Sequence, residues 1–253
     1  MVWWRPGWKS AAWACGLAAY IGGLIVTLPA TLVDAGLERA TRGHVRLAAA
    51  EGTLWSGAGH LEIRESGQRI GNAYRIAWRF LPWSLLRGHF AYTVQLDPAA
   101  RPFPVTIGWS GIALENADIR LPAAVLGMAV PKLAPLALGG DLSLHIASLD
   151  MGRARIQGNA VLQWQQARSA LTAVAPLGDY QLSLESNGAT TQAALRTRQG
   201  PLLLEGKGSW ANSGAPSFVG SASVPPPLQQ QLAPLLRLIA VERGAGNFEI
   251  QLK

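Results

Sequence analysis

The sequence contains a single cysteine, Cys15, among 253 residues. The chain therefore cannot form an intramolecular disulfide, and it has no set of cysteine ligands for a metal ion. Cys15 lies inside the longest apolar segment rather than near a histidine or a carboxylate. The near-absence of cysteine is compatible with an oxidising compartment but does not identify one.

Charged residues are also scarce, at 15% of the chain, compared with about 25% in a typical globular protein. This low share indicates a chain that lies partly in lipid or that has many apolar strand faces. The formal net charge is +7, but the sequence has no run of five or more Lys or Arg residues. Because nucleic-acid surfaces need a clustered basic face, we predict no nucleic-acid partner.

Patterns that would indicate catalysis or metal binding are missing as well. The four histidines lie far apart, without HExxH spacing, and the carboxylates are scattered singly. Residues 206–211 fit G-x-G-x-x-A, but the residues after them, Asn212-Ser213-Gly214, end structure instead of starting the helix that this motif requires. We therefore predict no metal and no cofactor, and the pattern argues against an enzyme, although folding can bring distant residues together.

Ser56 is the one hydroxyl that invites a catalytic interpretation, because glycines lie close to it. A nucleophile elbow needs glycine two residues before and two residues after the serine. Leu54 and Ala58 occupy those positions here. The stretch from Gly52 to Gly57 is better interpreted as a turn or bulge carrying one large ring, Trp55.

The N-terminus has the pattern of a membrane anchor. Residues 1–10 include Arg5 and Lys9 but no acidic residue, and the 24 residues from Ser10 to Val33 are uncharged. A helix of that length would extend about 36 Å, enough to cross a hydrocarbon core of about 30 Å. Because cationic flanks stay inside, we predict a cytoplasmic segment 1–10, a transmembrane signal anchor 11–33 in contact with membrane lipid, and a periplasmic domain 34–253.

A cleaved signal peptide is the alternative for this segment. Its apolar core would have 7–15 residues and a cleavage site with small residues. The uncharged stretch is longer, and residues 28–33, LPATLV, offer a poor cleavage site. An uncleaved, single-pass protein of the inner membrane is therefore the expected topology.

Beyond Ala40 the apolar residues alternate with polar ones, which is typical of antiparallel sheet with one buried face. Two clear examples are Tyr74-Ile76-Trp78-Phe80 and Phe90-Tyr92-Val94-Leu96. The fold class we predict is mainly β: one N-terminal transmembrane helix, then a twisted, mostly antiparallel sheet with two or three short helices. The helices are expected at 82–87, at 122–130 and at 225–243, the last as a kinked helix or as two short helices because of Pro234.

A weak internal similarity suggests two halves, at about 41–138 and 139–253. The segments 155–164 and 202–210 each place a glycine a few residues before a tryptophan. Either a duplication or the general use of glycine bends and tryptophan packing in one sheet would explain this pattern.

Two segments resemble the type II secretion system protein N family. The first is Gly52-Thr53-Leu54-Trp55-Ser56-Gly57, and the second is the W-x-hydrophobic-x-P-x-x-L-L-x-G pattern formed by Trp78, Pro82, Leu85, Leu86 and Gly88. Strand patterns of the same family are matched, in order, at 140–144, 158–164, 177–184 and 200–206. The resemblance therefore covers nearly the whole chain.

The resemblance implies an accessory inner-membrane component of the type II secretion machinery, with its mass in the periplasm and no catalytic residues. Its partners would be other inner-membrane or outer-membrane components of that machinery. The mechanism we expect is scaffolding through exposed strand edges or an apolar groove. A periplasmic AsmA-like carrier for lipid or another apolar ligand is the alternative, and it predicts an apolar trough. An enzyme would instead need a pocket in which a histidine and a carboxylate converge.

Overall fold

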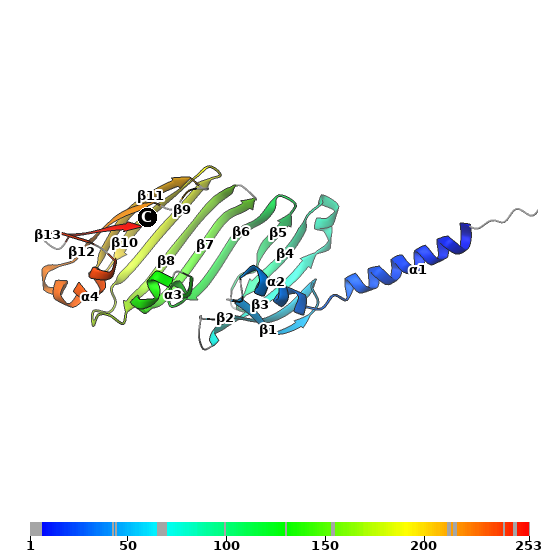
Figure 1. The fold of residues 1–253 in the computed structure, drawn as a ribbon, viewed down its shortest axis with the longest axis horizontal. Helices are drawn as coiled ribbons and strands as arrows, with labels where there is room; N and C mark the ends of the chain where they lie inside the picture. The colour runs from blue at the N-terminus through cyan, green and yellow to red at the C-terminus, as the bar shows by residue number, and fades with distance from the viewer. Residues whose placement is uncertain are drawn as a thin grey trace, which may run out of the picture. The chain divides into compact units, whose positions relative to one another are not determined.

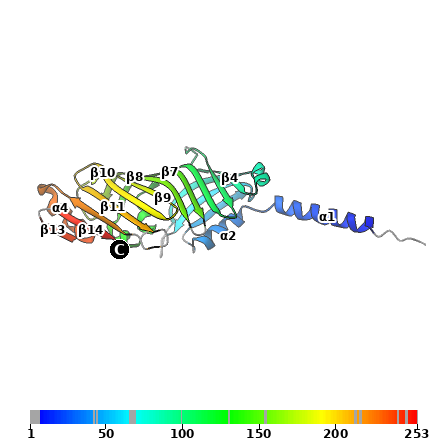
Figure 2. The ribbon, with the colours of Figure 1, turned by 90° about the horizontal axis from the view of Figure 1, so that it is seen from above.

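The computed structural model describes residues 7–41, 43, 45–64, 70–98, 100–129, 131–152, 155–211, 214, 217–239, 241–244 and 247–252. The chain divides into two compact units. Unit 1 comprises residues up to Leu81 together with Tyr92–Ala99, and unit 2 comprises Pro82–Ala91 together with residues from Ala100 onwards. Both units are built mainly from antiparallel strands (Figures 1 and 2). The proposed halves at 41–138 and 139–253 remain a prediction.

Unit 1 begins with two helices, α1 (Gly7–Val26) and α2 (Thr31–Ala40). The predicted anchor, 11–33, is therefore not one continuous helix. Pro29 has no backbone N–H, and its neighbours bond outside the helix: Leu28 O accepts from Leu54 N at 2.8 Å, and Ala30 N donates to Gly52 O at 3.2 Å. Within the described ranges, no helix combines the length and the apolar character needed to cross a membrane.

The strands of unit 1 follow the alternation of the sequence. They are β1 (Val45–Gly52), β2 (Ser56–Arg64), β3 (Ile70–Leu81) and the Tyr92–Leu96 part of β4 (Phe90–Leu96). β2 pairs antiparallel with both β1 and β3. Trp78, Leu47 and Ala30 form the buried cluster, and partly buried neighbours, among them Ile76, Tyr92 and Val94, pack against it.

Unit 2 contains the long strands. These are β5 (Phe103–Gly108), β6 (Gly111–Pro122), β7 (Leu138–Gly152), β8 (Ile156–Ser169), β9 (Gly178–Asn187), β10 (Thr190–Gln199), β11 (Leu203–Ala211), β12 (Phe218–Ser223), β13 (Val241–Gly244) and β14 (Asn247–Leu252). Each strand from β5 to β12 pairs with the next, and the order ends β12-β14-β13. The pairs are antiparallel, as the alternation predicts.

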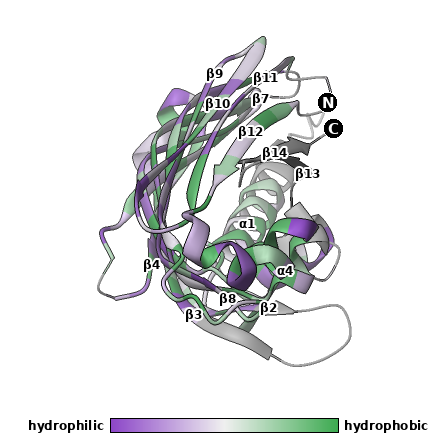
Figure 3. Ribbon diagram, turned by 90° about the vertical axis from the view of Figure 1, so that its left-hand side faces the viewer, coloured by the Kyte–Doolittle hydropathy of each residue, from purple (hydrophilic) through white to green (hydrophobic). Residues whose placement is uncertain are grey.

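The register of unit 2 places apolar residues opposite one another across several strands. One row runs from β6 to β10 through Ile119, Leu144, Leu162, Leu182 and Leu195. The adjacent row of the opposite face runs through Arg120, Ser143, Gln163, Gln181 and Arg196. Unit 2 therefore has one apolar sheet face and one polar sheet face, on a curved sheet (Figure 3).

Short helices interrupt the strands near the positions that the sequence predicts. They are η1 (Pro82–Arg87), α3 (Val125–Ala129), η2 (Pro131–Leu136), η3 (Pro226–Leu228) and α4 (Gln229–Ile239). Pro234 lies inside α4. η2 is an addition to the predicted helices, and its end lies close to the predicted border between the two halves.

α4 covers one end of the apolar sheet face, the end at which β8 meets β9. Leu232, Leu235 and Leu236 of α4 are almost completely buried, at 0–3% exposure. They pack in one cluster with Tyr180, Leu202 and residues of η2 and β12. The apolar stripe at 228–239 thus packs on a sheet face.

Tyr180 is the polar group at the centre of this cluster. Its side chain is 3% exposed, and its hydroxyl lies 3.1 Å from Leu177 O and 3.0 Å from Leu202 O. Burial raises the pKa of the phenol well above its ordinary value of 10.0, and the neighbouring Asp179 carboxylate raises it further. The folded state therefore holds the phenol in its neutral form.

We expect the contribution of Tyr180 to stability to decrease as the pH rises above 10. The raised pKa of the folded state means that unfolded chains lose the proton first, so alkaline conditions favour unfolding. Replacing Tyr180 with Phe should cost about 1–3 kcal/mol near neutral pH, because the buried carbonyls of Leu177 and Leu202 lose the one hydroxyl proton that they share. The variant should also show a smaller alkaline loss of stability than the parent in urea unfolding. Parallel pH profiles of the two proteins would contradict this assignment.

Candidate functional site

The loop that joins β1 to β2, Thr53–Trp55, is held by several hydrogen bonds. Thr53 N donates to Ser56 O at 2.9 Å. The Thr53 hydroxyl oxygen accepts from the backbone N–H groups of Trp55 and Ser56, at 3.3 and 3.2 Å. A hydroxyl that satisfies turn amides in this way fixes the loop conformation locally.

Two glycines, Gly52 and Gly57, face each other where the hairpin closes. Gly52 has φ +92°, which other residues rarely adopt. A Cβ on Gly57 would lie 2.5 Å from Glu51 O and 2.5 Å from Cζ2 of Trp78. Both positions thus require glycine, one for its backbone angle and one for the space that the indole of Trp78 occupies.

Trp78 of β3 links the two family segments. Its side chain is 7% exposed, and its indole N–H is directed at the carbonyl oxygens of Thr53 and Leu54, at 3.3 and 3.1 Å. The ring thus packs against Gly57 while its one polar group satisfies loop carbonyls. A buried indole normally needs such a partner.

Trp55 connects the loop to α1. Its indole N–H donates to Ile25 O at 2.8 Å, and Phe80 N donates to Trp55 O at 2.6 Å. The ring is half-buried, with its centroid 4.9 Å from that of Phe80, which lies 5.3 Å from Tyr92. Burial raises the pKa of Tyr92. The loop from Gly52 to Gly57 therefore joins the end of α1 to three strands.

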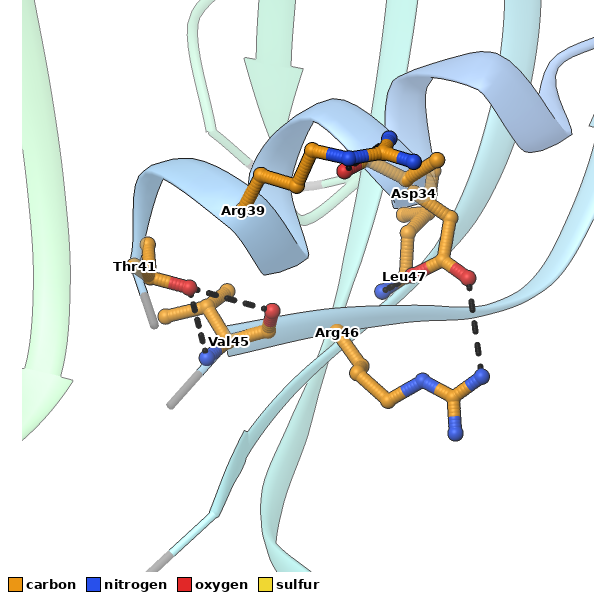
Figure 4. A network of polar contacts seen from close by, with 7 residues as sticks. Asp34, Arg39, Thr41, Val45, Arg46 and Leu47 are labelled. Atoms are coloured by element: carbon orange, nitrogen blue, oxygen red, sulfur yellow. Dashed lines mark hydrogen bonds and ion pairs between the residues drawn. The ribbon is translucent and has the colours of Figure 1, made fainter. Parts of the chain in front are cut away.

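α2 packs along β1, where it bonds groups of the outer strand of unit 1 (Figure 4). Asp34 accepts from Leu47 N at 2.8 Å, and its other oxygen lies 3.7 Å from the Arg46 guanidinium. The Thr41 hydroxyl bonds the N–H of Val45 at 3.1 Å. Because edge strands offer unpaired backbone groups to other chains, α2 reduces the availability of this edge.

The second family segment continues from Trp78 into η1. Ser84 is buried, and its hydroxyl accepts from Ala91 N at 3.0 Å. Leu85 and Leu86, by contrast, are 49% and 82% exposed. Pro82 starts η1, and Gly88 follows it with φ +75°. The segment is thus a braced turn that presents apolar side chains outwards.

One histidine meets a carboxylate in the described residues. His145 Nδ1 lies 2.6 Å from Asp118 Oδ1, across paired positions of β6 and β7. Both side chains are 53% exposed, so the pair lies on the open polar face of the sheet.

The other histidines lie elsewhere. His89 lies near the Arg87 carbonyl, His60 is exposed on β2, and His44 is outside the described residues. No group of three or more His, Cys, Asp or Glu residues that could hold a metal ion occurs within the described ranges.

The contacts described for the Gly52–Gly57 loop therefore join structural elements of unit 1, and we call this loop the junction. Ser56 is exposed, and its backbone, rather than its hydroxyl, makes the bonds described above. Sequence reasoning identified the residues of both family segments but not the contacts of Trp78 with the loop. It also missed α2, although Asp34 just after the uncharged segment and Thr41 before the first strand are helix-end signals that could have indicated it.

We expect Gly57→Ala to destabilise unit 1 by about 1–3 kcal/mol, because the new methyl group would overlap Glu51 O and the Trp78 ring. Gly36 provides the matched control, because it is exposed in α2 and no atom lies within 4 Å of the position that a methyl group would take there. Gly36→Ala should be neutral or stabilise by up to about 1 kcal/mol through helix propensity. Thermal unfolding of both variants measures the difference. Equal melting temperatures of the two variants would show that unit 1 does not require glycine at position 57.

Comparisons with known proteins identify the family of this chain. Residues 43–251 match the family described as Type II secretion system (T2SS), protein N. The chain is 29% identical over 245 residues to the Type II secretion system protein N of Aeromonas hydrophila, which covers 93% of this chain and 94% of that protein. No solved structure matches. The match extends over both family segments and nearly all strands, and the chain belongs to the type II secretion system protein N family.

Proposed function

We propose that the protein is an accessory inner-membrane component of the type II secretion system that supports the export of folded proteins across the outer membrane by scaffolding. The family membership supports the secretion role. The junction at Gly52–Gly57 is the observation that carries the scaffolding mechanism. It bonds the end of α1 to the β1–β2 loop and to β3, so that an attached helix and a sheet are held together.

The membrane attachment is assigned to the N-terminal segment. All side chains described in α1, from residue 12 to residue 26, are exposed, and most of them are apolar. A helix that is apolar on all sides is suited to lipid. Arg5 and Lys9, which precede the uncharged stretch, and Asp34 and Glu38, which follow it, favour a cytoplasmic N-terminus and a periplasmic bulk. Since Leu28 and Ala30 bond to the β1–β2 loop, the lipid-embedded part would end near Val26 instead of Val33.

The partners would be other components of the secretion machinery. In unit 2 the last strand of the sheet order is the four-residue β13, whose outer side is suited to the addition of a strand from another protein. In unit 1, α2 bonds along the outer strand. We therefore assign partner contact by strand addition to the β13 edge.

A secretion assay tests this function. In a host whose own gene for this protein is deleted, the wild-type chain should restore the appearance of type II substrates in the medium. Trp55→Ala should reduce this restoration, because it removes the bond to Ile25 O and the ring contact with Phe80, at a cost of about 3 kcal/mol.

Ser56→Ala provides the matched control at the neighbouring position. The Ser56 side chain is exposed, so its loss should leave both folding and secretion intact. Loss of secretion by a folded Ser56→Ala protein would overturn the structural role assigned to the junction. Full secretion by the host without the gene would overturn the accessory role itself.

An apolar-ligand carrier of the AsmA-like type is a second candidate, favoured by the apolar face of unit 2. α4 and η2 cover one end of this face. Leu144, Leu162 and Leu182, further along, are only partly buried, and a single sheet accounts for all the described strands of unit 2. Such a face could receive an acyl chain through non-directional apolar contact.

Binding of a fluorescent long-chain fatty acid to the purified full chain distinguishes the two candidates. For a carrier, Leu184→Gln should weaken binding severalfold, because it places an amide on the apolar face. Ser183→Gln is the matched control, because adjacent strand residues point to opposite faces and Ser183 lies on the polar one. Absence of saturable binding, or equal loss in both variants, would eliminate the carrier.

A further inference from the structure

We propose that Arg196 and Arg198 of β10, together with Gln181 of β9, form a binding site for the phosphate group of a small polar molecule. Gln181 and Arg196 lie opposite each other on the polar face of unit 2, and Arg198 bonds to the same glutamine. The site is therefore distinct from the junction and from the apolar face, and the inference does not depend on the proposed role in secretion.

The first observation is that two guanidinium groups meet at one neutral oxygen. Arg196 Nη2 donates to Gln181 Oε1 at 3.1 Å, and Arg198 Nη1 donates to the same oxygen at 3.0 Å. An amide oxygen has two lone pairs, so these donors occupy it fully, whereas each guanidinium has five N–H groups. Two positive charges are thus gathered at a point that carries no negative charge.

The second observation is that Gln181 is held in place while the arginines are open to solvent. Gln181 is 8% exposed, and its Nε2 donates to Ser183 Oγ at 3.3 Å. Arg196 and Arg198 are both exposed, and neither guanidinium makes a further hydrogen bond within the described residues. A buried amide therefore orients both groups and leaves most of their donors available. Such preorganisation lowers the entropy lost on binding.

The third observation is that the neighbouring carboxylates do not pair with these arginines. Asp179 of β9 has both oxygens engaged, because Oδ1 accepts from Gln166 N at 2.8 Å and Oδ2 accepts from Gln199 Nε2 at 2.7 Å. Glu205 of β11 is opposite Arg196 in the register. Across the part of unit 2 that the structure describes, however, neither arginine forms an ion pair. The positive charge of the site is left for a ligand.

Charge and donor number favour a phosphate group over a carboxylate. One guanidinium satisfies a carboxylate through two parallel N–H···O bonds. A phosphate monoester carries a charge of about −1.5 to −2 at pH 7 and has three acceptor oxygens, so it can accept from two guanidiniums at once. Two arginines oriented toward one point match this group in charge and in geometry.

A polar hollow beside the site provides room for the rest of the ligand. Its volume is about 630 Å³, within the usual range of small-molecule sites. Ser183, which bonds Gln181, is part of its lining. The polar lining residues are Ser183, Glu185, Gln192, Lys207, Ser209 and Ser217. Because such side chains suit hydroxyl groups better than acyl chains, the ligand class we assign is a phosphate monoester of a polyol or sugar.

Calorimetric titration of the purified full chain in detergent with glycerol 3-phosphate tests the site. We expect saturable binding that Arg196→Gln and Arg198→Gln each weaken at least tenfold. Glu205→Gln should strengthen it severalfold, because the change removes a negative charge opposite Arg196. All three side chains are exposed, so their replacement should leave folding intact, which thermal unfolding checks. Absence of saturable binding to the parent protein would overturn the proposal.

Arg120→Gln is the matched control, because Arg120 is exposed in the same polar row but lies on β6, four strands from Arg196. It should leave the affinity unchanged. An equal loss in this variant would show general attraction by a basic surface and would overturn a specific site.

Three further ligands test the assigned chemistry. Inorganic phosphate should bind more weakly than glycerol 3-phosphate, because it makes no contact in the polar hollow, and equal affinity would overturn the role of the hollow. Binding to phosphatidic acid vesicles without binding to glycerol 3-phosphate would overturn the soluble ester in favour of a lipid headgroup. Tighter binding of a tetraglutamate peptide would overturn phosphate in favour of an acidic protein segment.

Discussion

Two indole N–H groups hold unit 1 together. The N–H of Trp78 bonds loop carbonyls at Thr53 and Leu54, and that of Trp55 bonds Ile25 O. A buried indole that lost its partner would carry a substantial desolvation cost, so each bond constrains the position of a whole ring. Because the Trp78 ring also fills the space next to Gly57, the loop, β3 and the end of α1 depend on one another. The family segments are therefore related through packing, not through a shared reaction.

The period-two alternation of apolar residues made most of the fold predictable. Tyr74 to Phe80 and Phe90 to Leu96 form strands β3 and β4, as expected. A strand with one apolar face has few alternatives once its neighbours have the same period. The short helices at Pro82 and in the region 225–239 were predictable too, because proline and a helical leucine stripe are local signals.

The end of α1 and the presence of α2 were not predictable in this way. Residues 28–33 are uncharged, and they continue the apolar segment in composition. Pro29 is a local signal, but its missing N–H does not by itself stop a helix in an apolar segment; Leu28 O and Ala30 N also bond to Leu54 and Gly52, which lie far along the chain. The contact between Trp78 and Gly57 has the same origin, because a sequence pattern gives the order of two segments but not their pairing. The candidate site was thus predictable as a set of residues and not as an arrangement.

The same alternation also leaves unit 2 with an apolar face that a single sheet cannot cover. Closing that face needs a second layer, and α4 supplies it only at the end where Leu232 and Leu236 pack on Tyr180. The leucines further along shield one another through neighbouring strands, which accounts for their partial burial. Each additional Å² of that face removed from water would contribute about 25 cal/mol. An acyl chain or a partner segment that covers this face would gain binding free energy from buried apolar area and from shape complementarity. It would not meet Arg120 or Arg196, because these residues lie in a row of the opposite face. A carrier would therefore use this apolar face, whereas the proposed scaffold would contact its partner at the β13 edge.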